Sequence, residues 1–268
     1  DIVGLDCLTT DSALVRSSTT LSNQLFTRSV ARPHGWVFVI PLQKRTSYGY
    51  VYNARVSSLE AVQADLSRLM AQENASCSGE ERLLSFPNFA HKKTFDGSLW
   101  KLGNACSFLE PLEATAIFLQ TSSLTQALRF PLDRWKARLL QRPFANPIQN
   151  DQLQVQIDQL NRWLFRDSLK CAAFVSWHYA HGSKFNTPFW NTAQLAFQNG
   201  RKRFPDTEIW DEMVAYLNAA KGFPHLEAFI AAHGAHKSTA TSPLVHDEKG
   251  FGQWQLPSFI EIQRGLSG

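Results

Sequence analysis

The sequence predicts an α+β fold, in which an antiparallel sheet region is followed by a mainly helical C-terminal region. Strand-like runs fill roughly the first hundred residues, whereas helical spacing of apolar residues begins after residue 105. Strands first and helices later favour an α+β fold over an alternating βαβ order. The motif GxGxxG occurs nowhere in the 268 residues, so a complete dinucleotide-binding half is absent from this chain.

The clearest strand signal is a pair of aromatic and β-branched runs. "GWVFVIPL" (35–42) and "YGYVYN" (48–53) are joined by a short polar stretch, which predicts a β-hairpin. Tyr48, Tyr50 and Tyr52 alternate along the second run and therefore share one face of the strand. We expect these three side chains to pack in the core or on the sheet surface rather than to form a ligand pocket.

A helix and further extended segments follow the hairpin. "SSLEAVQADLSRLMAQ" (57–72) has apolar residues at helical spacing, and Ser57 or Ser58 can cap the helix. "LLSFPNFAHKKTF" (83–95) returns to extended structure. "SLW" (98–100) is predicted to end a strand just before Gly103.

The second half of the chain is predicted to be helical. We divide the chain into a sheet-rich region (1–102), a segment that carries the candidate site (103–126) and a helical region (127–268). The apolar periodicity predicts six helices, which cover residues 107–126, 131–143, 151–180, 188–199, 207–219 and 256–264.

Charge and composition exclude several classes of protein. The net charge is +4, and the basic residues fall in small separated groups, which indicates a solvated surface rather than a nucleic-acid interface. The four cysteines lie far apart without a CxxC pair, which is typical of a reducing compartment and of neither a zinc cluster nor a disulfide scaffold. No apolar run reaches the ~18 residues that a membrane helix needs, and no signal peptide is visible. We therefore expect a cytoplasmic protein without a membrane segment.

The stretch "LGNACSFLEPLEATAIF" (102–118) has the pattern of a tight turn followed by a helix. Gly103 allows the backbone to turn tightly or to approach a ligand, and Asn104 can hydrogen-bond a hydroxyl group. The helix N-terminus that follows suits an anion. Pro111 is tolerated in a first helical turn, so we expect the helix to begin near Glu110. From spacing alone, Glu110 and Glu113 are more often structural than catalytic.

Two histidine pairs have the i,i+3 spacing that could ligate a metal ion. They are His178 with His181 and His233 with His236. Neither pair has a carboxylate or a cysteine at a matching offset, so we expect structural or surface histidines and no metal site.

Several motifs, in order along the chain, resemble the flavin-dependent halogenases of the tryptophan-halogenase type. "LGNACSFLEPLEATAI" resembles the GxAxxFxEPLE[ST]T segment of that family, and "GWVFVIPLQKRTSYGYVYN" (35–53) resembles its GWxWxIPLxxRxxxGYxY hairpin. "LNRWLFRDSLKCAAFVSWHY" (160–179) is similar to its FNR…HY helix, and "NTPFW" (186–190) to its DTPFW. The resemblance extends over nearly the whole chain, but the N-terminal half of the family, with its GxGxxG and catalytic lysine, has no counterpart here.

The resemblance implies a role for individual residues. Glu113 matches the active-site glutamate that orients the oxidant or takes up the proton of the substrate, while Glu110 is expected to cap the helix. Thr115 and Ala116 match the positions whose backbone N–H groups hold the halide. The residues that match flavin contacts are Gly103, Asn104, Ala105 and Pro111. Those that match the barrier between substrate and flavin are Trp36, Phe38, Ile40 and Pro41.

The resemblance also implies the chemistry and the partners. Reduced FAD, supplied by a separate flavin reductase, and oxygen oxidise chloride or bromide to hypohalous acid, which halogenates an indole, a pyrrole or a phenol. Trp163, Trp177 and Trp190 lie in the region from which the family builds its substrate pocket. The oligomeric state stays open, with a homodimer among the options. Since the flavin-binding half is missing, we expect the isolated chain to bind FAD poorly and to be inactive.

Two departures from the family pattern leave alternatives open. Ala114 stands where many members carry serine, and Phe38 stands where the family has the second tryptophan of its hairpin. The second change keeps open an aromatic monooxygenase that does not use a halide. A third interpretation is a non-catalytic remnant that binds an aromatic ligand or a partner protein.

Overall fold

The computed structural model describes residues 1–22, 24–110, 112–129, 150–224, 228, 231, 254 and 256–267. The chain divides into two compact units, each assembled from separate segments. One, here called the sheet unit, consists of Asp6–Asn88, Ala173–Phe204 and Gly265–Gly268. The other, here called the helix unit, consists of Asp1–Leu5, Phe89–Ala172 and Pro205–Arg264. The three regions proposed from the sequence stay a prediction.

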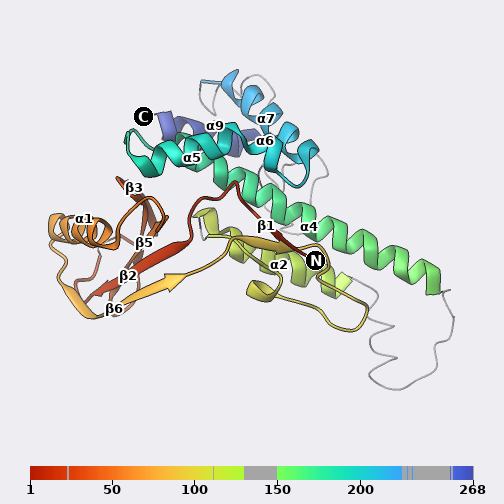
Figure 1. Ribbon diagram of the computed structural model, residues 1–268, viewed down its shortest axis with the longest axis horizontal. Coiled ribbons are helices and arrows are strands. Elements are labelled where there is room, and N and C mark those ends of the chain that lie inside the picture. Colours follow the sequence, from red (N-terminus) through yellow and green to blue (C-terminus); the bar gives the residue numbers. More distant parts are fainter. Residues whose placement is uncertain are drawn as a thin grey trace. The chain divides into compact units, whose positions relative to one another are not determined.

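The sheet unit is built around a five-stranded antiparallel sheet with the order β3-β4-β5-β2-β6 (Figure 1). The predicted hairpin is confirmed, because β4 and β5 pair with Trp36 opposite Val51 and Phe38 opposite Gly49. The strands are β2 (Ser12–Ser18), β3 (Arg28–Arg32), β4 (Gly35–Pro41), β5 (Thr46–Tyr52) and β6 (Cys77–Ser85).

One face of this sheet packs against α1 (Leu59–Gln72). The alternation along the strands brings the three tyrosines of β5 into this core together with Val37 and Val39 of β4. The helix contributes its apolar stripe, which includes Val62, Leu66 and Leu69. Ser58 caps the helix by accepting a hydrogen bond from the Ala61 N–H at 3.3 Å, as the sequence predicts.

A buried ion pair joins α1 to the last residue of β3. Asp65 of α1 is 1% exposed and accepts from the Arg32 guanidinium at 2.9 and 2.7 Å. The Tyr50 hydroxyl also donates to Asp65, at 3.0 Å. Because two donors satisfy this buried carboxylate, it fixes the helix on the sheet rather than destabilising the core.

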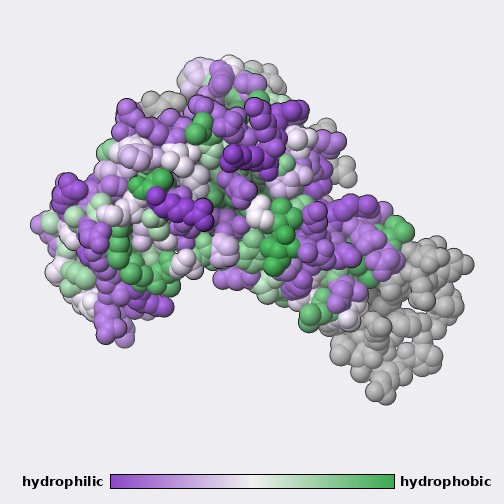
Figure 2. Space-filling model, in the orientation of Figure 1, coloured by the Kyte–Doolittle hydropathy of each residue, from purple (hydrophilic) through white to green (hydrophobic). Residues whose placement is uncertain are grey.

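β6 forms an edge of the sheet and exposes Leu83 and Leu84. Figure 2 shows apolar side chains on the face in view where Figure 1 places β2 and β6. In the part of the chain that the structure describes, no helix is long and apolar enough to cross a membrane.

The helix unit contains a small antiparallel sheet with the order β1-β7-β8, formed by β1 (Ile2–Gly4), β7 (Phe89–His91) and β8 (Ser107–Phe108). The long helix α4 (Asn150–His181) provides its first part, to Ala172, to this unit and its remainder to the sheet unit. The helix unit also contains α2 (Thr115–Arg129), α7 (Thr207–Lys221) and most of α9 (Leu256–Ser267), whereas α5 (Pro188–Gln198) and α6 (Gly200–Arg203) belong to the sheet unit.

Four of the predicted helices are confirmed to within a few residues: 151–180 as α4, 188–199 as α5, 207–219 as α7 and 256–264 as α9. The prediction for 131–143 lies outside the described residues. The strand predicted at 98–100 is wrong, because the backbone there forms only an isolated bridge between Phe95 and Trp100. The Asp96 carboxylate instead accepts from the Ser98 and Leu99 N–H groups at 2.8 Å and folds this segment into a turn.

Candidate functional site

The flavin-matching segment of the sequence is a short turn in the helix unit. Gly103–Ala105 forms the 3₁₀ turn η1, closed by the Cys106 N–H, which donates to the Gly103 carbonyl at 2.9 Å. Gly103 has a φ of +57°, in the left-handed region that a residue with a Cβ rarely adopts. A Cβ at this position would also lie 3.4 Å from Nε2 of Gln120. Asn104 and Ala105 are exposed, so this part of the turn is open to solvent.

The helix after this turn begins later than the sequence predicts. Ser107 and Phe108 pair with Ala90 and Phe89 as β8, so they cannot belong to a helix. A 3₁₀ turn, η2 (Leu112–Ala114), follows, and α2 begins only at Thr115. The expectation of a helix from 107, or from near Glu110, is therefore wrong.

The two glutamates of this stretch precede α2. The first turn of α2 contains no acidic residue, so Glu110 lies before the helix, and its expected role as a cap stays a prediction. Glu110 is fully buried, and its backbone carbonyl accepts from the Thr115 hydroxyl at 3.1 Å. Glu113 lies in η2, and its side chain, like the whole of Pro111, is outside the described residues.

The residue at the junction of η2 and α2 has a strained backbone. Ala114 has a φ of +54°, which costs a residue with a Cβ about 1–2 kcal/mol relative to the right-handed region. Such strain occurs where the surrounding structure fixes the backbone, often at functional sites. Thr115 and Ala116 follow directly and are the first two residues of α2, at the end of the helix where its dipole is positive.

A small pocket connects the turn with the helix. Its lining includes Gly103 and Asn104 of η1, Ala116 and Gln120 of α2, and Asp167 of α4. Three of the residues predicted from the sequence, Gly103, Asn104 and Ala116, thus face one pocket, whereas Ala105 and Thr115 are not in its lining. The cavity volume is about 20 Å³, enough for about one water molecule.

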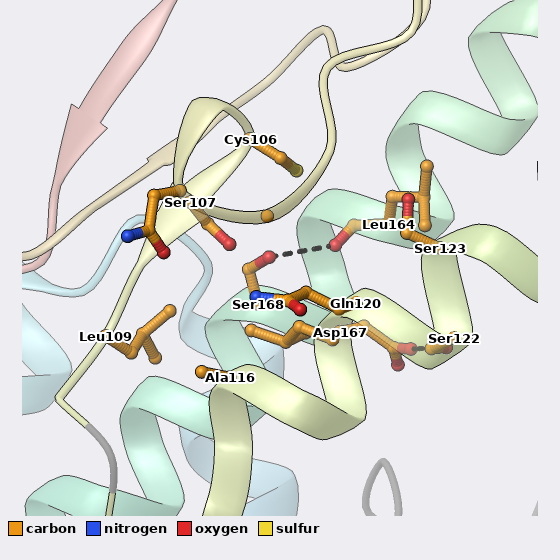
Figure 3. A pocket seen from close by; sticks show the side chains of 13 residues that line it. Cys106, Ser107, Leu109, Ala116, Gln120, Ser122, Ser123, Leu164, Asp167 and Ser168 are labelled. Carbon is orange, nitrogen blue, oxygen red and sulfur yellow. Dashed lines mark hydrogen bonds between the residues drawn. The ribbon is translucent and has the colours of Figure 1, made fainter.

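Asp167 is a pocket residue that the sequence analysis does not identify. Its carboxyl is directed at Ser122 of α2, whose hydroxyl donates to Oδ2 at 3.3 Å (Figure 3). Burial raises the pKa of this carboxyl to about 6, although the Ser122 hydrogen bond opposes the shift. The sequence does contain a signal that Asp167 lies on the buried face of the helix, because it stands at helical spacing between Leu164 and Cys171, which are both buried.

The residues matched to the barrier between substrate and flavin lie on β4, in the sheet unit. Trp36 and Phe38 point to the same face of the strand and are each 5% exposed. Ile40, the next residue on that face, is 38% exposed, and Pro41 is half-buried. The structure therefore buries the two aromatic members of the predicted set and leaves the other two at the more open end of the strand.

The histidines of the first pair have structural surroundings. Nδ1 of His178 lies 2.9 Å from the Phe174 carbonyl, and Nδ1 of His181 lies 3.3 Å from the Trp177 carbonyl. Burial lowers the pKa of His178 to about 4, so the ring is neutral at physiological pH. His233 and His236 lie outside the described residues. Over the described ranges, no group of three or more His, Cys, Asp and Glu side chains could hold a metal ion.

Comparison with known proteins gives the class of this fold. Xcc4156, a flavin-dependent halogenase from Xanthomonas campestris, superimposes with a TM-score of 0.57 at 26% identity over 72% of this chain and 36% of that one. The tryptophan 6-halogenase SttH from Streptomyces toxytricini matches 99% of this chain and 46% of its own, with a TM-score of 0.67 at 19% identity. The fold is therefore that of flavin-dependent halogenases.

The sequence comparison identifies the family. The family model described as tryptophan halogenase matches residues 5–241, and the chain belongs to this family. The 7-chloro-L-tryptophan 6-halogenase KtzR from Kutzneria sp. (strain 744) is 22% identical over 237 residues, which are 85% of this chain and 42% of that protein. The chain thus spans less than half the length of the relatives and solved structures that it matches.

Proposed function

We propose that this chain is the substrate-side portion of an FAD-dependent halogenase that uses reduced flavin, oxygen and chloride or bromide to halogenate an electron-rich aromatic compound. The observation that carries the proposal is the pocket in the helix unit, which is lined by both the Gly103–Asn104 turn and Ala116 at the start of α2. A flavin-contact segment and a halide-contact segment must lie close together for halide oxidation. Membership of the tryptophan halogenase family supports the same function.

The residues of the turn fit a flavin. Gly103 has no Cβ and a left-handed backbone, so a planar ring system can approach the main chain there. Asn104 is exposed and can hydrogen-bond a hydroxyl group of the cofactor, and the exposed Ala105 adds backbone contacts. We include Pro111 among the flavin contacts on the resemblance alone. When bound, reduced FAD would supply the electrons that activate oxygen for halide oxidation.

In this proposal the start of α2 holds the halide. The N–H groups of Thr115 and Ala116 are oriented donors at the positive end of a helix dipole, which suits a small anion. Their geometry is fixed by the Thr115 hydroxyl, which is bonded to the Glu110 carbonyl at 3.1 Å. Donors that are already oriented stabilise developing charge without reorganisation during the reaction.

Glu113 would act at the aromatic substrate. As hypohalous acid attacks the ring, the carbon–halogen bond forms, the halogen–oxygen bond breaks, and the ring becomes cationic. Glu113 would stabilise this cation and remove the proton from the substituted carbon. That proton and the released hydroxide then form water. Trp36, Phe38, Ile40 and Pro41 would keep the substrate away from the flavin so that halogenation competes with direct oxygenation.

We propose further that the remaining flavin contacts come from outside these 268 residues. GxGxxG is absent here, and the matched structures are more than twice as long as the region matched. A flavin reductase would deliver the reduced cofactor.

A second candidate is an aromatic monooxygenase that does not use a halide. Phe38 favours it, because this residue replaces the second tryptophan of the family hairpin and a smaller ring gives a thinner barrier.

The role of Glu113 is tested by Glu113→Gln in the full-length protein that contains this chain. With FAD, a flavin reductase, NADH and bromide, we expect brominated product to form about 100-fold or more slowly, since the base is lost while the shape is kept. Flavin reduction should be unchanged. The matched control is Glu208→Gln, whose side chain is 85% exposed on α7. Equal bromination rates for Glu113→Gln and the wild type would remove Glu113 from the mechanism.

A further inference from the structure

Trp36 lies in a cluster of aromatic rings that three motifs of the sequence build together. Its indole meets the ring of Tyr179 edge-on at 6.1 Å and the ring of Trp190 edge-on at 5.3 Å between centroids. Phe189 completes the cluster at 5.9 Å from Tyr179 and 5.2 Å from Trp190. Tyr179 belongs to the end of α4, and Phe189 and Trp190 belong to the start of α5. All four rings are buried in the sheet unit.

The orientation of the Trp36 ring is not set by a hydrogen bond of its own. The indole Nε1 is buried and has no hydrogen-bond partner among the described residues. A buried indole N–H is normally paired, because an unpaired one has lost its hydrogen bonds to water without replacing them. The ring is therefore held by its neighbours and by the backbone that carries it.

The backbone that leads into Trp36 is hydrogen-bonded by the N-cap residue and the first turn of α5. The Thr187 hydroxyl donates to the Pro33 carbonyl at 2.6 Å, and the indole N–H of Trp190 donates to the Arg32 carbonyl at 2.8 Å. Arg32 is the last residue of β3, and Pro33 begins the link to β4, which leads into Trp36. The side chain of the same Arg32 is held to α1 by its buried ion pair with Asp65.

Gly182, just after α4, leaves room for the ring. A Cβ at this position would lie 2.6 and 2.7 Å from two carbons of the Trp36 indole and 2.5 Å from the His178 carbonyl oxygen. No side chain fits at such distances, because the nearest atoms include rigid backbone. The backbone just after α4 therefore lies close to one edge of the indole.

We propose that the corner between α4 and α5, made of Tyr179, Gly182, Thr187 and Trp190, is a positioning device for Trp36. It sets the tilt of the indole on β4 and thereby shapes the aromatic barrier between flavin and substrate. The existence of that barrier rests on the proposed function. In this proposal Thr187 and Gly182 act only through the position of Trp36, without contacting substrate or cofactor. The "HY" and "NTPFW" motifs are thereby explained as supports of the tryptophan in "GWVFVIP".

The test changes Thr187 and Gly182 and measures the ¹⁹F resonance of the Trp36 ring. The full-length protein is labelled with 5-fluorotryptophan, and the ¹⁹F resonance of Trp36 is assigned by its loss in Trp36→Phe. Thr187→Val keeps the shape but removes the donor, and Gly182→Ala introduces the clash. We expect both variants to move or split the Trp36 resonance. Thr187→Ser, which keeps the hydroxyl, should restore the wild-type position.

The matched control is Thr192→Val in the same helix. The Thr192 hydroxyl bonds only within α5, to the Pro188 carbonyl at 2.8 Å, so its loss should leave the Trp36 resonance in place. An unmoved resonance in Thr187→Val overturns the proposal even if Gly182→Ala fails to fold. So does an equal shift in Thr192→Val.

The second readout is the ratio of halogenated to oxygenated product with bromide and an indole substrate. We expect Thr187→Val to lower this ratio about two- to tenfold, the range that corresponds to one neutral hydrogen bond. A moved resonance with an unchanged ratio overturns the link between positioning and the barrier. If the wild type makes no halogenated product, the proposed function fails, and the ¹⁹F resonance alone decides whether the corner positions Trp36.

Discussion

Ala114 is the residue where the backbone before α2 departs most from ordinary geometry. Its φ of +54° places it in the left-handed region between η2 and α2. Glycine would remove the steric penalty of about 1–2 kcal/mol while adding about 0.5–1 kcal/mol of chain entropy lost on folding. We therefore expect Ala114→Gly to raise the free energy of unfolding by about 0.5–1 kcal/mol, measured by urea denaturation.

The control for this substitution is Ala215→Gly, at an exposed position inside α7. The same chemical change there should lower the free energy of unfolding by about 1 kcal/mol, because the backbone is already helical. Equal destabilisation by both variants would show that Ala114 is not strained.

Asp167 gives the stability of the helix unit a defined pH dependence. Burial raises the pKa of its carboxyl to about 6 from the ordinary value of 3.8, so the folded state holds this proton more tightly than the unfolded state. The stability that it contributes is complete below pH 3.8 and is lost as the pH rises through 6. The free energy of unfolding of the wild type, relative to Asp167→Asn, should fall by about 3 kcal/mol across that window.

The measurement is urea denaturation of both proteins at several pH values. Ser122→Ala should move the window to higher pH, because it removes the hydrogen bond that favours the ionised carboxyl. Parallel pH profiles for the wild type and Asp167→Asn would contradict this account.

At the scale of elements, α4 holds the turn region of the helix unit through one side chain. Asn161 is 4% exposed, and its Oδ1 accepts from the Thr94 and Phe95 N–H groups at 2.9 Å. Its Nδ2 donates to the Phe95 carbonyl at 2.7 Å. One amide thus satisfies both the donors and the acceptor of a buried loop, which explains the asparagine in the motif "LNRW".

Removing this amide should loosen the loop from the helix. Asn161→Ala leaves two backbone N–H groups and a carbonyl buried without their partner, so we expect it to lower the free energy of unfolding by about 3 kcal/mol or more. The control is Gln154→Ala, an exposed amide on the same helix whose bond to Asp158 lies at the surface. A difference below about 1 kcal/mol between the two variants, measured by urea denaturation, would argue against Asn161 as the anchor.

Elements with a strong local pattern can be predicted from this sequence. The hairpin of β4 and β5, the Ser58 cap and the long helix α4 follow from alternation, capping and helical spacing. The start of α2 cannot be predicted in this way, because Ser107 and Phe108 are recruited into a strand by pairing with residues of β7. That pairing is a tertiary contact, and it overrides the helical pattern of the segment.

The candidate site is predictable in part for the same reason. Gly103 is conspicuous because a glycine before a helix indicates a special backbone conformation, and its φ of +57° agrees. Asp167 contributes to the pocket only because α2 and α4 pack together, and no local pattern encodes that packing. The relation of Trp36 to Thr187 and Trp190 joins residues more than 150 positions apart, so it emerges only from the fold.

At the scale of the whole molecule, the chain is a family member that spans less than half of the relatives that it matches. Its two units hold different parts of the proposed chemistry. In the proposed function, the helix unit would carry the flavin and halide segments with Glu113, and the sheet unit would carry the aromatic barrier of β4. The proposed reaction would therefore depend on residues of both units.

The most direct measurement is mass spectrometry of the products that the full-length protein forms from indole, pyrrole and phenol substrates. The reactions contain FAD, a flavin reductase, NADH and oxygen, with and without bromide. We predict a product in which bromine replaces hydrogen, recognisable by its paired isotope peaks, and that it forms only when bromide is present. A hydroxylated product that forms equally well without bromide, and no brominated product, would contradict the halogenase proposal and favour the monooxygenase.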